Sequence, residues 1–343
     1  MIHPRLLRIA LVLGLLAVAL GGWAWWQAGR SAQAREGVAP RVCALPPQAA
    51  DAPHPGMVWV PGGVLDFGDT VYPEEGPLRQ VPVSGFWMDR TEVTNAQFAE
   101  FVRATGYVTV AERPVDARTH PGLPADMLKP GAVVFTMPNA VNGRGDVTQW
   151  WRYTPGASWR HPGGPDTDLQ GREAFPVVAL TYEDAAAFAR WKGRSLPSEV
   201  QWEWAARAAR PGKADGTGDQ PPKEANTWQG LFPVQNSGDD GFVGLAPVGC
   251  YAPNALGLHD LLGNVWEITR DPWTPDHGAP PLPPELLPPQ RPGPGQQRVI
   301  KGGSYLCAPS YCMRYRAGAR QPQEDDLAMS HLGFRTILVA PGP

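Results

Sequence analysis

The chain has 343 residues and a formal net charge of −3, with neither a basic run nor a basic-aromatic stripe, so nucleic acid is not an expected partner. Its 39 glycines and 40 prolines make up about 23% of the residues against a usual value of about 12%, and this excess argues against long helices. Intrinsic disorder is also excluded, because 43% of the residues are hydrophobic and 14 are tryptophan, enough to build a sizeable core.

The N-terminal segment 1–28 is predicted to be a signal anchor or a signal peptide. Arg5 and Arg8 precede an uncharged apolar run of about 18 residues, a length between those of a signal-peptide core and a membrane-spanning helix. The run ends at Trp26 in a tryptophan cluster typical of a membrane interface. We therefore expect a membrane-anchored protein whose domain lies outside the cytoplasm, or a secreted protein if the segment is cleaved.

A linker and a single folded domain are predicted to follow. Residues 29–55 are rich in Ala, Pro and Gln and lack hydrophobic periodicity, which is typical of a linker. The domain is expected over residues 56–340 and begins with a strand at 57–60, which a Pro-Gly-Gly sequence ends. The Pro-rich stretch 272–296 is expected to be an exposed loop.

Helical periodicity is confined to the first 210 residues. The three predicted helices start near Thr94, Thr181 and Pro197. In the first, Gln97 completes a capping box with Thr94, and Gly106 follows the end of the helix. The chain after residue 210 alternates short apolar pieces with Gly, Asn, Asp and Pro, so the sequence predicts an α+β domain with little regular secondary structure.

Two cysteines near the C-terminus are candidates for redox or metal chemistry. Cys307 and Cys312 are five positions apart with Pro309 between them, and such a turn can direct both sulfurs to one point. Thiolates select soft ions such as Cu(I). The same spacing also suits a local disulfide or two unrelated thiols. The arginines that follow can lower the pKa of the thiols or can bridge the core; they are Arg314, Arg316 and Arg320.

Two segments offer the oxygen ligands that calcium prefers. The first combines Asn226 with Asp240, and the second combines Asp260 with Glu267. Simpler interpretations exist for both segments. Asn226 and Asp240 suit Asx turns, and Asp260 can cap a turn while Glu267 pairs with an arginine. The sequence contains no phosphate-binding glycine loop, no hydrolase nucleophile elbow and no histidine pair at metal-binding spacing.

The chain from about residue 56 to 339 resembles the formylglycine-generating enzymes, also called sulfatase-modifying factors. The matching segments are 57–63 (MVWVPGG), 89–95 (DRTEVTN), 161–166 (HPGGPD), 193–203 (GRSLPSEVQWE), 263–267 (GNVWE) and 332–335 (LGFR). The most specific segments are 302–307 (GGSYLC) and 310–312 (SYC). The resemblance implies a fold similar to that of C-type lectins.

The resemblance also implies a function. Cys307 and Cys312 correspond to the copper-binding catalytic cysteines, and Ser304 to the active-site serine, of an oxidase that uses O2. The substrate would be a cysteine in an unfolded sulfatase polypeptide, which is converted to formylglycine. Structural Ca2+ would be bound by eight residues: the side chains of Asn226, Asp240, Asp260 and Glu267 and the carbonyls of Thr227, Phe242, Gly263 and Val265.

Two departures from the family pattern keep other interpretations open. Cys43 and Cys250 match no family disulfide, although they can pair with each other in an oxidising compartment. The N-terminal segment is atypical as well. A membrane-tethered, lectin-like binding module without enzymatic activity is therefore an alternative, as is an oxidase of the same fold that acts on another exported protein.

Overall fold

The computed structural model describes residues 52–143, 145–207, 224–278 and 295–339, together with residues 43, 45, 47, 48, 222 and 342. The chain divides into a unit of residues 1–42 and a compact unit Cys43–Pro343, and the described residues belong to the second unit. The predicted anchor over 1–28 and most of the predicted linker lie outside the described residues. No helix in the described part of the chain combines the length and the apolar character that crossing a bilayer requires.

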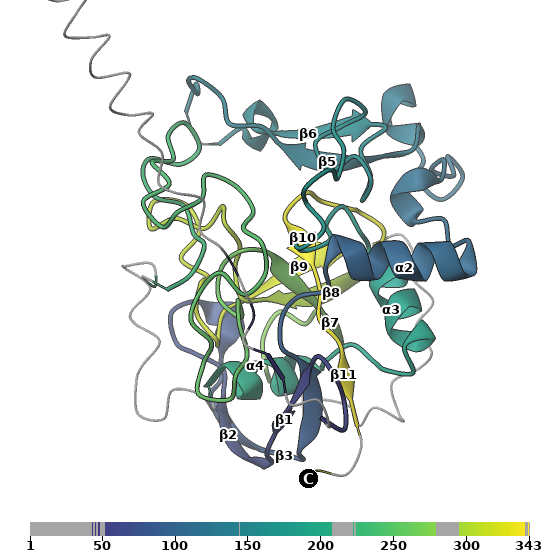
Figure 1. Cartoon of the computed structure of the whole chain (residues 1–343). Helices are drawn as coiled ribbons and strands as arrows, with labels where there is room; N and C mark the ends of the chain where they lie inside the picture. The colour runs from purple at the N-terminus through teal and green to yellow at the C-terminus, as the bar shows by residue number, and fades with distance from the viewer. Residues whose placement is uncertain are drawn as a thin grey trace, which may run out of the picture. The chain divides into compact units, whose positions relative to one another are not determined.

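In the described part of the domain the strands form four small sheets (Figure 1). The four-stranded central sheet has the order β10 (Leu332–Gly333), β7 (Trp266–Pro272), β8 (Gln297–Lys301), β9 (Arg320–Glu324). A second sheet has the order β1 (Met57–Val60), β4 (Phe86–Asp89), β11 (Ile337–Leu338), and two hairpins pair β2 (Gly63–Phe67) with β3 (Arg79–Val83) and β5 (Gly131–Phe135) with β6 (Trp151–Pro155). All these pairs are antiparallel except β10–β7.

The helices begin close to the positions that the sequence predicts. The α-helices of the described residues are α2 (Asn95–Thr105), α3 (Tyr182–Trp191) and α4 (Glu199–Arg207). Thr94 and Gln97 form the predicted capping box of α2, and Gly106 ends the helix in a left-handed conformation that glycine adopts without strain. The 3₁₀ helices of the same described ranges are η1 (Pro73–Glu75), η2 (Val110–Glu112), η3 (Ala125–Leu128) and η4 (Val147–Gln149). This low helix content agrees with the composition.

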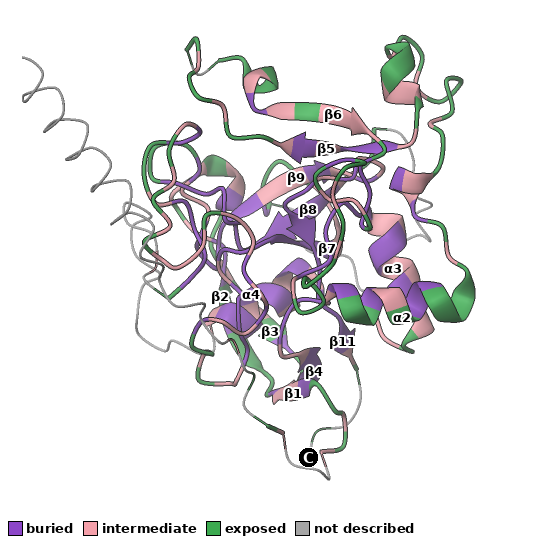
Figure 2. Ribbon diagram, turned by 45° about the horizontal axis from the view of Figure 1, so that its top comes forward, coloured by how far each residue is buried: buried purple, intermediate pink, exposed green. Residues whose placement is uncertain are grey.

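The largest apolar cluster lies between the central sheet and the helices α2 and α3. Phe98 and Phe101 of α2 pack against Phe188 of α3, with ring centroids 5.9 and 5.7 Å from that of Phe188. Trp266 of β7 and Ile300 of β8 belong to the same cluster. The first half of β7 and nearly all of β8 are buried (Figure 2), so the loop that leaves the end of β8 starts from a rigid base.

One loop prediction was partly wrong. The stretch 272–296 was expected to be exposed, but His277 within it is only 3% exposed. Its ring stacks on Phe67 at 4.0 Å and its Nε2 lies 3.3 Å from the Glu199 carboxylate. A buried carboxylate therefore holds part of a segment whose composition suggested a loop in solvent. Residues 279–294 lie outside the described residues.

Candidate functional site

Both candidate cysteines lie in the loop 302–319, which joins the adjacent strands β8 and β9. The loop folds back on itself through two short turns: the backbone N–H of Cys307 donates to the Ser304 carbonyl, and that of Cys312 to the Ala308 carbonyl, each at 2.9 Å. The second turn brings Cys312 back toward Cys307, although the two residues are five positions apart in the sequence. Both side chains are buried, with Cys307 fully inaccessible and Cys312 only 8% exposed.

The two cysteines are free thiols whose sulfurs contact each other. The local disulfide that the spacing also allowed is thus absent. Burial raises the pKa of Cys307 well above its ordinary value, whereas the hydrogen bond from Cys307 lowers the pKa of Cys312. One proton is therefore held by Cys307, and Cys312 is the sulfur that carries negative charge most readily. A thiolate beside a second sulfur is a donor set suited to a soft cation.

The third predicted catalytic residue, Ser304, is fully buried at the start of the same loop. Its hydroxyl oxygen accepts the N–H of Leu306 at 3.3 Å, and its carbonyl accepts the N–H of Cys307. Ser304 thus shapes the turn that positions Cys307.

Aromatic side chains surround the cysteine loop. The backbone N–H of Trp228 donates to the Cys307 carbonyl at 3.0 Å. Tyr311, which directly precedes Cys312, stacks on Phe232 with ring centroids 4.0 Å apart and remains 43% exposed. The loop is therefore covered from one side by aromatic rings, and Tyr311 is its most exposed aromatic residue.

The three arginines after the cysteines form ion pairs with acidic residues from distant segments; the pairs of Arg316 with Glu75 and of Arg320 with Glu199 are buried, and that of Arg314 with Glu74 is partly buried. Arg314 pairs with Glu74 at 2.6 Å, Arg316 with Glu75 at 2.5 Å and also with Asp69, and Arg320 with Glu199 at 2.8 Å. Arg314 also lowers the pKa of Cys312, so both interpretations of these arginines apply to it. The carboxylates were not found from the sequence, because they lie in η1, in α4 and in the connection between β2 and η1.

The first predicted calcium set has an unused oxygen. Asn226 is buried, and its Oδ1 has no hydrogen-bond partner, while its amide nitrogen donates to Gly244 and Asn264. The Asp240 carboxylate lies beside this segment and accepts the backbone N–H groups of Thr227 at 2.9 Å and Phe242 at 3.2 Å. These residues fit an oxygen-rich cation site, because a buried carbonyl oxygen without a donor requires some positive partner.

The second predicted calcium set fits less well. Arg335 donates two hydrogen bonds of 2.7 Å to the Glu267 carboxylate, and Trp202 donates a third at 2.9 Å. Asp260 accepts the N–H of Gly249 at 2.6 Å. This is the arrangement of the simpler interpretation, a turn cap and an arginine pair. Glu92, which sequence reasoning missed, lies in the same cluster with a buried Oε2 that has no partner. No group of three His, Cys, Asp or Glu within the described ranges has metal-binding geometry.

Backbone hydrogen bonds connect the three candidate segments directly. Gly263 donates to Gly302 at 3.0 Å, Asn264 to Asn226 at 2.8 Å, and Tyr305 to Asn264 at 2.9 Å. Gly263 has a φ of +81°, and a Cβ there would lie 2.3 Å from the Asn226 carbonyl oxygen, so only glycine permits this approach. The conformation of the cysteine loop therefore depends on both oxygen-rich segments.

The remaining cysteines, Cys43 and Cys250, form a disulfide across 207 residues of sequence. The sequence left this pairing open, and the structure contains it. The disulfide attaches the N-terminal end of the unit to the segment that contains Gly249. The backbone N–H of Gly249 donates to the Asp260 carboxylate.

Comparisons with known proteins show the family and the fold of the chain. The model of the sulfatase-modifying factor enzyme 1-like domain matches residues 42–340. A formylglycine-generating enzyme of Mycobacterium tuberculosis is 47% identical over 82% of this chain and 97% of its own length. The inactive C-alpha-formylglycine-generating enzyme 2 of Mus musculus is 35% identical, over 86% of this chain and 90% of its own. Among solved structures, PvdO from Pseudomonas aeruginosa shares the fold, with a TM-score of 0.56 and 21% identity over 82% of this chain and 93% of PvdO.

Proposed function

Because this chain belongs to the sulfatase-modifying factor family of formylglycine-generating oxidoreductases, we propose that it oxidises a cysteine of a sulfatase polypeptide to Cα-formylglycine with O2, using copper held by Cys307 and Cys312. The observation that carries the proposal is the pair of free, buried sulfurs in contact. Burial excludes bulk water from these sulfurs, and two thiolates leave room for a third sulfur ligand from the substrate.

Within this proposal the residues of the chain have separate tasks. Cys312, whose pKa is lowered by Cys307, supplies the first thiolate, and Cys307 releases its proton when the cation binds. Copper bound to the pair supplies the means to activate O2 for removal of a Cβ hydrogen from the substrate cysteine. Tyr311, whose ring stacks on the buried Phe232, provides an exposed aromatic surface for the incoming polypeptide next to Cys312, and Ser304 holds the turn before Cys307.

Calcium is proposed as a structural cofactor. Asn226 and Asp240, with the carbonyls of Thr227 and Phe242, are the stronger candidate ligands, since Asn226 Oδ1 has no partner. Asp260 and Glu267, with the carbonyls of Gly263 and Val265, are the weaker set, because Arg335 already neutralises Glu267.

An extracytoplasmic location is also proposed. The Cys43–Cys250 disulfide favours an oxidising compartment, where such bonds persist. The proposed membrane attachment depends on residues 1–28, and cleavage of that segment would give a secreted protein.

Mass spectrometry of a sulfatase-motif peptide after aerobic incubation with the copper-loaded protein tests the function. The expected product is lighter by about 18 Da, the difference between a thiol-bearing carbon and an aldehyde. A peptide whose cysteine is replaced by serine serves as the matched control. An unchanged mass after prolonged incubation would instead favour the non-enzymatic binding module.

A further inference from the structure

Arg314 has different surroundings from the other two arginines that follow the cysteines. Arg316 faces two carboxylates, and Arg320 donates to both oxygens of the Glu199 carboxylate, so the charge of each is compensated. Arg314 has one carboxylate partner within the described residues, Glu74 at 2.6 Å. Because a guanidinium presents several N–H groups in one plane, a single carboxylate leaves donors for a second contact.

The second contact of Arg314 is the sulfur of Cys312. The hydrogen bond from Cys307 does most to lower the pKa of Cys312, and hydrogen bonds from the backbone N–H and the guanidinium of Arg314 add to this effect. Burial raises the pKa of Cys307, and the positive charge of Arg314 opposes that shift. One cation therefore acts on both sulfurs of the pair.

The position of this guanidinium is fixed by its other neighbours. Its carbon lies 4.1 Å from the ring centroid of Tyr72, its Nε donates to the Arg320 carbonyl at 3.3 Å, and its Nη2 donates to Glu74. A Cβ on Gly303 would lie 3.0 Å from the Arg314 carbonyl oxygen, so the two ends of the cysteine loop are packed together. Only 22% of the Arg314 side chain is exposed, so solvent screens its charge weakly.

The charge of the site changes most when the substrate binds. Under the proposed function, the thiolates of Cys307 and Cys312 with one Cu(I) carry one net negative charge. A substrate cysteine that joins them as a thiolate, with its proton released to solvent, adds a second negative charge. The attraction of a nearby cation therefore increases at this step. A serine hydroxyl at the same position would add no charge and would gain nothing from Arg314.

We propose that Arg314 is a specificity-determining residue, which favours an ionised thiol over a hydroxyl in the substrate by balancing the negative charge that a third thiolate brings to Cys307 and Cys312. Glu74 and Tyr72 hold its guanidinium beside the sulfur. The inference rests on the proposed function for the copper and for the cysteine substrate. It deepens that function by assigning the group that compensates the charge of the bound substrate.

The test measures peptide binding to the copper-loaded full chain without O2, so that no turnover occurs. A sulfatase-motif peptide with its cysteine, and the same peptide with serine in its place, are titrated by calorimetry. We expect the wild-type protein to prefer the cysteine peptide. Arg314→Gln should reduce this preference about ten-fold, equal to about 1.4 kcal/mol, and leave the affinity for the serine peptide unchanged. Competition with bicinchoninate checks the Cu(I) loading of each protein.

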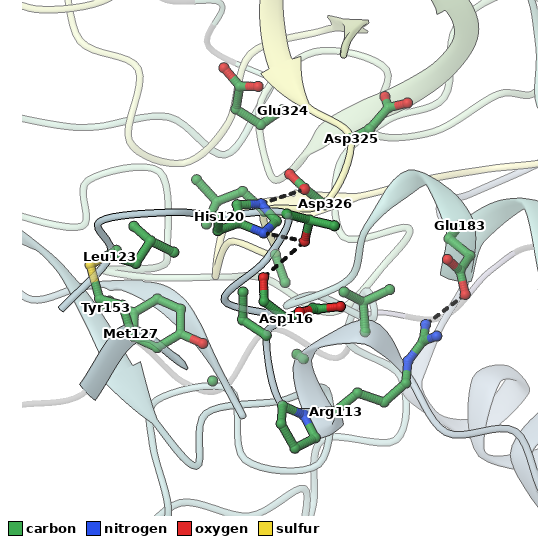
Figure 3. A pocket seen from close by; sticks show the side chains of 18 of the residues that line it. Arg113, Asp116, His120, Leu123, Met127, Tyr153, Glu183, Glu324, Asp325 and Asp326 are labelled. Atoms are coloured by element: carbon green, nitrogen blue, oxygen red, sulfur yellow. Dashed lines mark hydrogen bonds and ion pairs between the residues drawn. The ribbon is translucent and has the colours of Figure 1, made fainter. Parts of the chain in front are cut away.

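The control variants separate the charge of Arg314 from its structural contacts. Glu74→Gln breaks the same ion pair but keeps the cation and an acceptor oxygen, so it should not reduce the preference. Arg314→Lys keeps a cation with fewer donors and should retain most of the preference. Arg113→Gln removes an arginine from an ion pair of equal length, formed with Glu183 at 2.6 Å (Figure 3), and should change nothing.

An equal cysteine preference in Arg314→Gln and the wild type would overturn the inference. So would an equal loss in Glu74→Gln, which would assign the effect to the ion pair, or equal weakening of both peptides by Arg314→Gln, which would indicate a distorted site. If Arg314→Gln does not fold, the double variant with Glu74→Gln removes both charges of the pair together and still lacks the cation.

The failure of this inference can be told from the failure of the proposed function. Peptide oxidation by the wild type, together with an unchanged cysteine preference in Arg314→Gln, would refute the role of Arg314 alone. A copper-loaded wild-type protein that neither prefers nor oxidises the cysteine peptide would refute the proposed function, and this inference with it.

Discussion

Cys43 and Cys250, which are 207 residues apart, are joined in a disulfide, whereas Cys307 and Cys312, which are five positions apart, are free thiols. Distance along the chain therefore does not decide which cysteines are oxidised. The distant pair is half-buried and ties the N-terminal end of the unit to its core, and the close pair is deeply buried in a loop fixed by hydrogen bonds at both turns. The protein thus combines one pair with a structural role and one pair whose reduced sulfurs are available for chemistry.

The largest expected effect separates the two pairs by activity. Cys307→Ser and Cys312→Ser should each lower formylglycine formation by at least about 10³-fold, because a hydroxyl is a poor ligand for a soft cation. Peptide oxidation followed by mass spectrometry measures the effect, and thermal unfolding checks that the domain remains folded. Cys250→Ser is the matched control and should retain turnover. Full activity in both loop variants would contradict the role of the pair.

The second expected effect separates the pairs by stability. Cys43→Ser should lower the free energy of unfolding by about 2–4 kcal/mol, because the unfolded chain regains the freedom that the bridge removes. Urea unfolding followed by tryptophan fluorescence measures this change. Prior reduction of the wild-type protein should reproduce it, and a wild-type protein insensitive to reduction would show that the bridge has no structural role.

A third, smaller effect concerns the pH dependence of stability. His331 is buried against Trp151 at 4.7 Å, and burial lowers its pKa to about 3. Between pH 6.5 and 3 the unfolded state binds this proton and the folded state does not, so stability falls as pH falls below 6.5. From pH 7 to pH 5 the contribution is about 2 kcal/mol.

His331→Gln should reduce this acid sensitivity by that amount. Unfolding free energies at the two pH values measure it. Cys250→Ser should keep the wild-type pH dependence, since a disulfide does not titrate. An identical pH dependence in His331→Gln and the wild type would show that His331 is not the buried neutral base described above.

The smallest expected effect concerns calcium beside the cysteine loop. Chelation should lower the stability of the calcium-loaded protein by about 1 kcal/mol, or roughly 2–4 °C in melting temperature, because a ligand of the folded state alone is removed. Asn226→Leu removes the unpartnered Oδ1 and should make the melting temperature insensitive to the chelator. A wild-type transition that chelation leaves unchanged would favour the Asx-turn interpretation.

Local features of the fold could be predicted, because the residues that cause them are close in sequence. The capping box of Thr94 and Gln97 acts over three residues, and it gave the start of α2 correctly. The strand at Met57–Val60 and the low helix content follow from equally local patterns. The cysteines in the loop 302–319 were predicted for the same reason, since their spacing and motif lie within one segment.

Features that join distant segments could not be predicted from spacing. Glu75 is 241 residues from its partner Arg316, and nothing local distinguishes it from a surface glutamate. The same holds for Glu92, whose buried oxygen lies in the cluster of Asp260.

The buried ion pairs around the cysteine loop have a consequence for protein engineering. A transplant of residues 302–319 into another scaffold would carry Arg316 without Glu75, and its junction with β9 would carry Arg320 without Glu199. Each such arginine would be an uncompensated charge in an apolar interior, which destabilises a protein by about 3–5 kcal/mol. A portable version of this loop would therefore have to include the acidic residues of η1 and α4 as part of the same module.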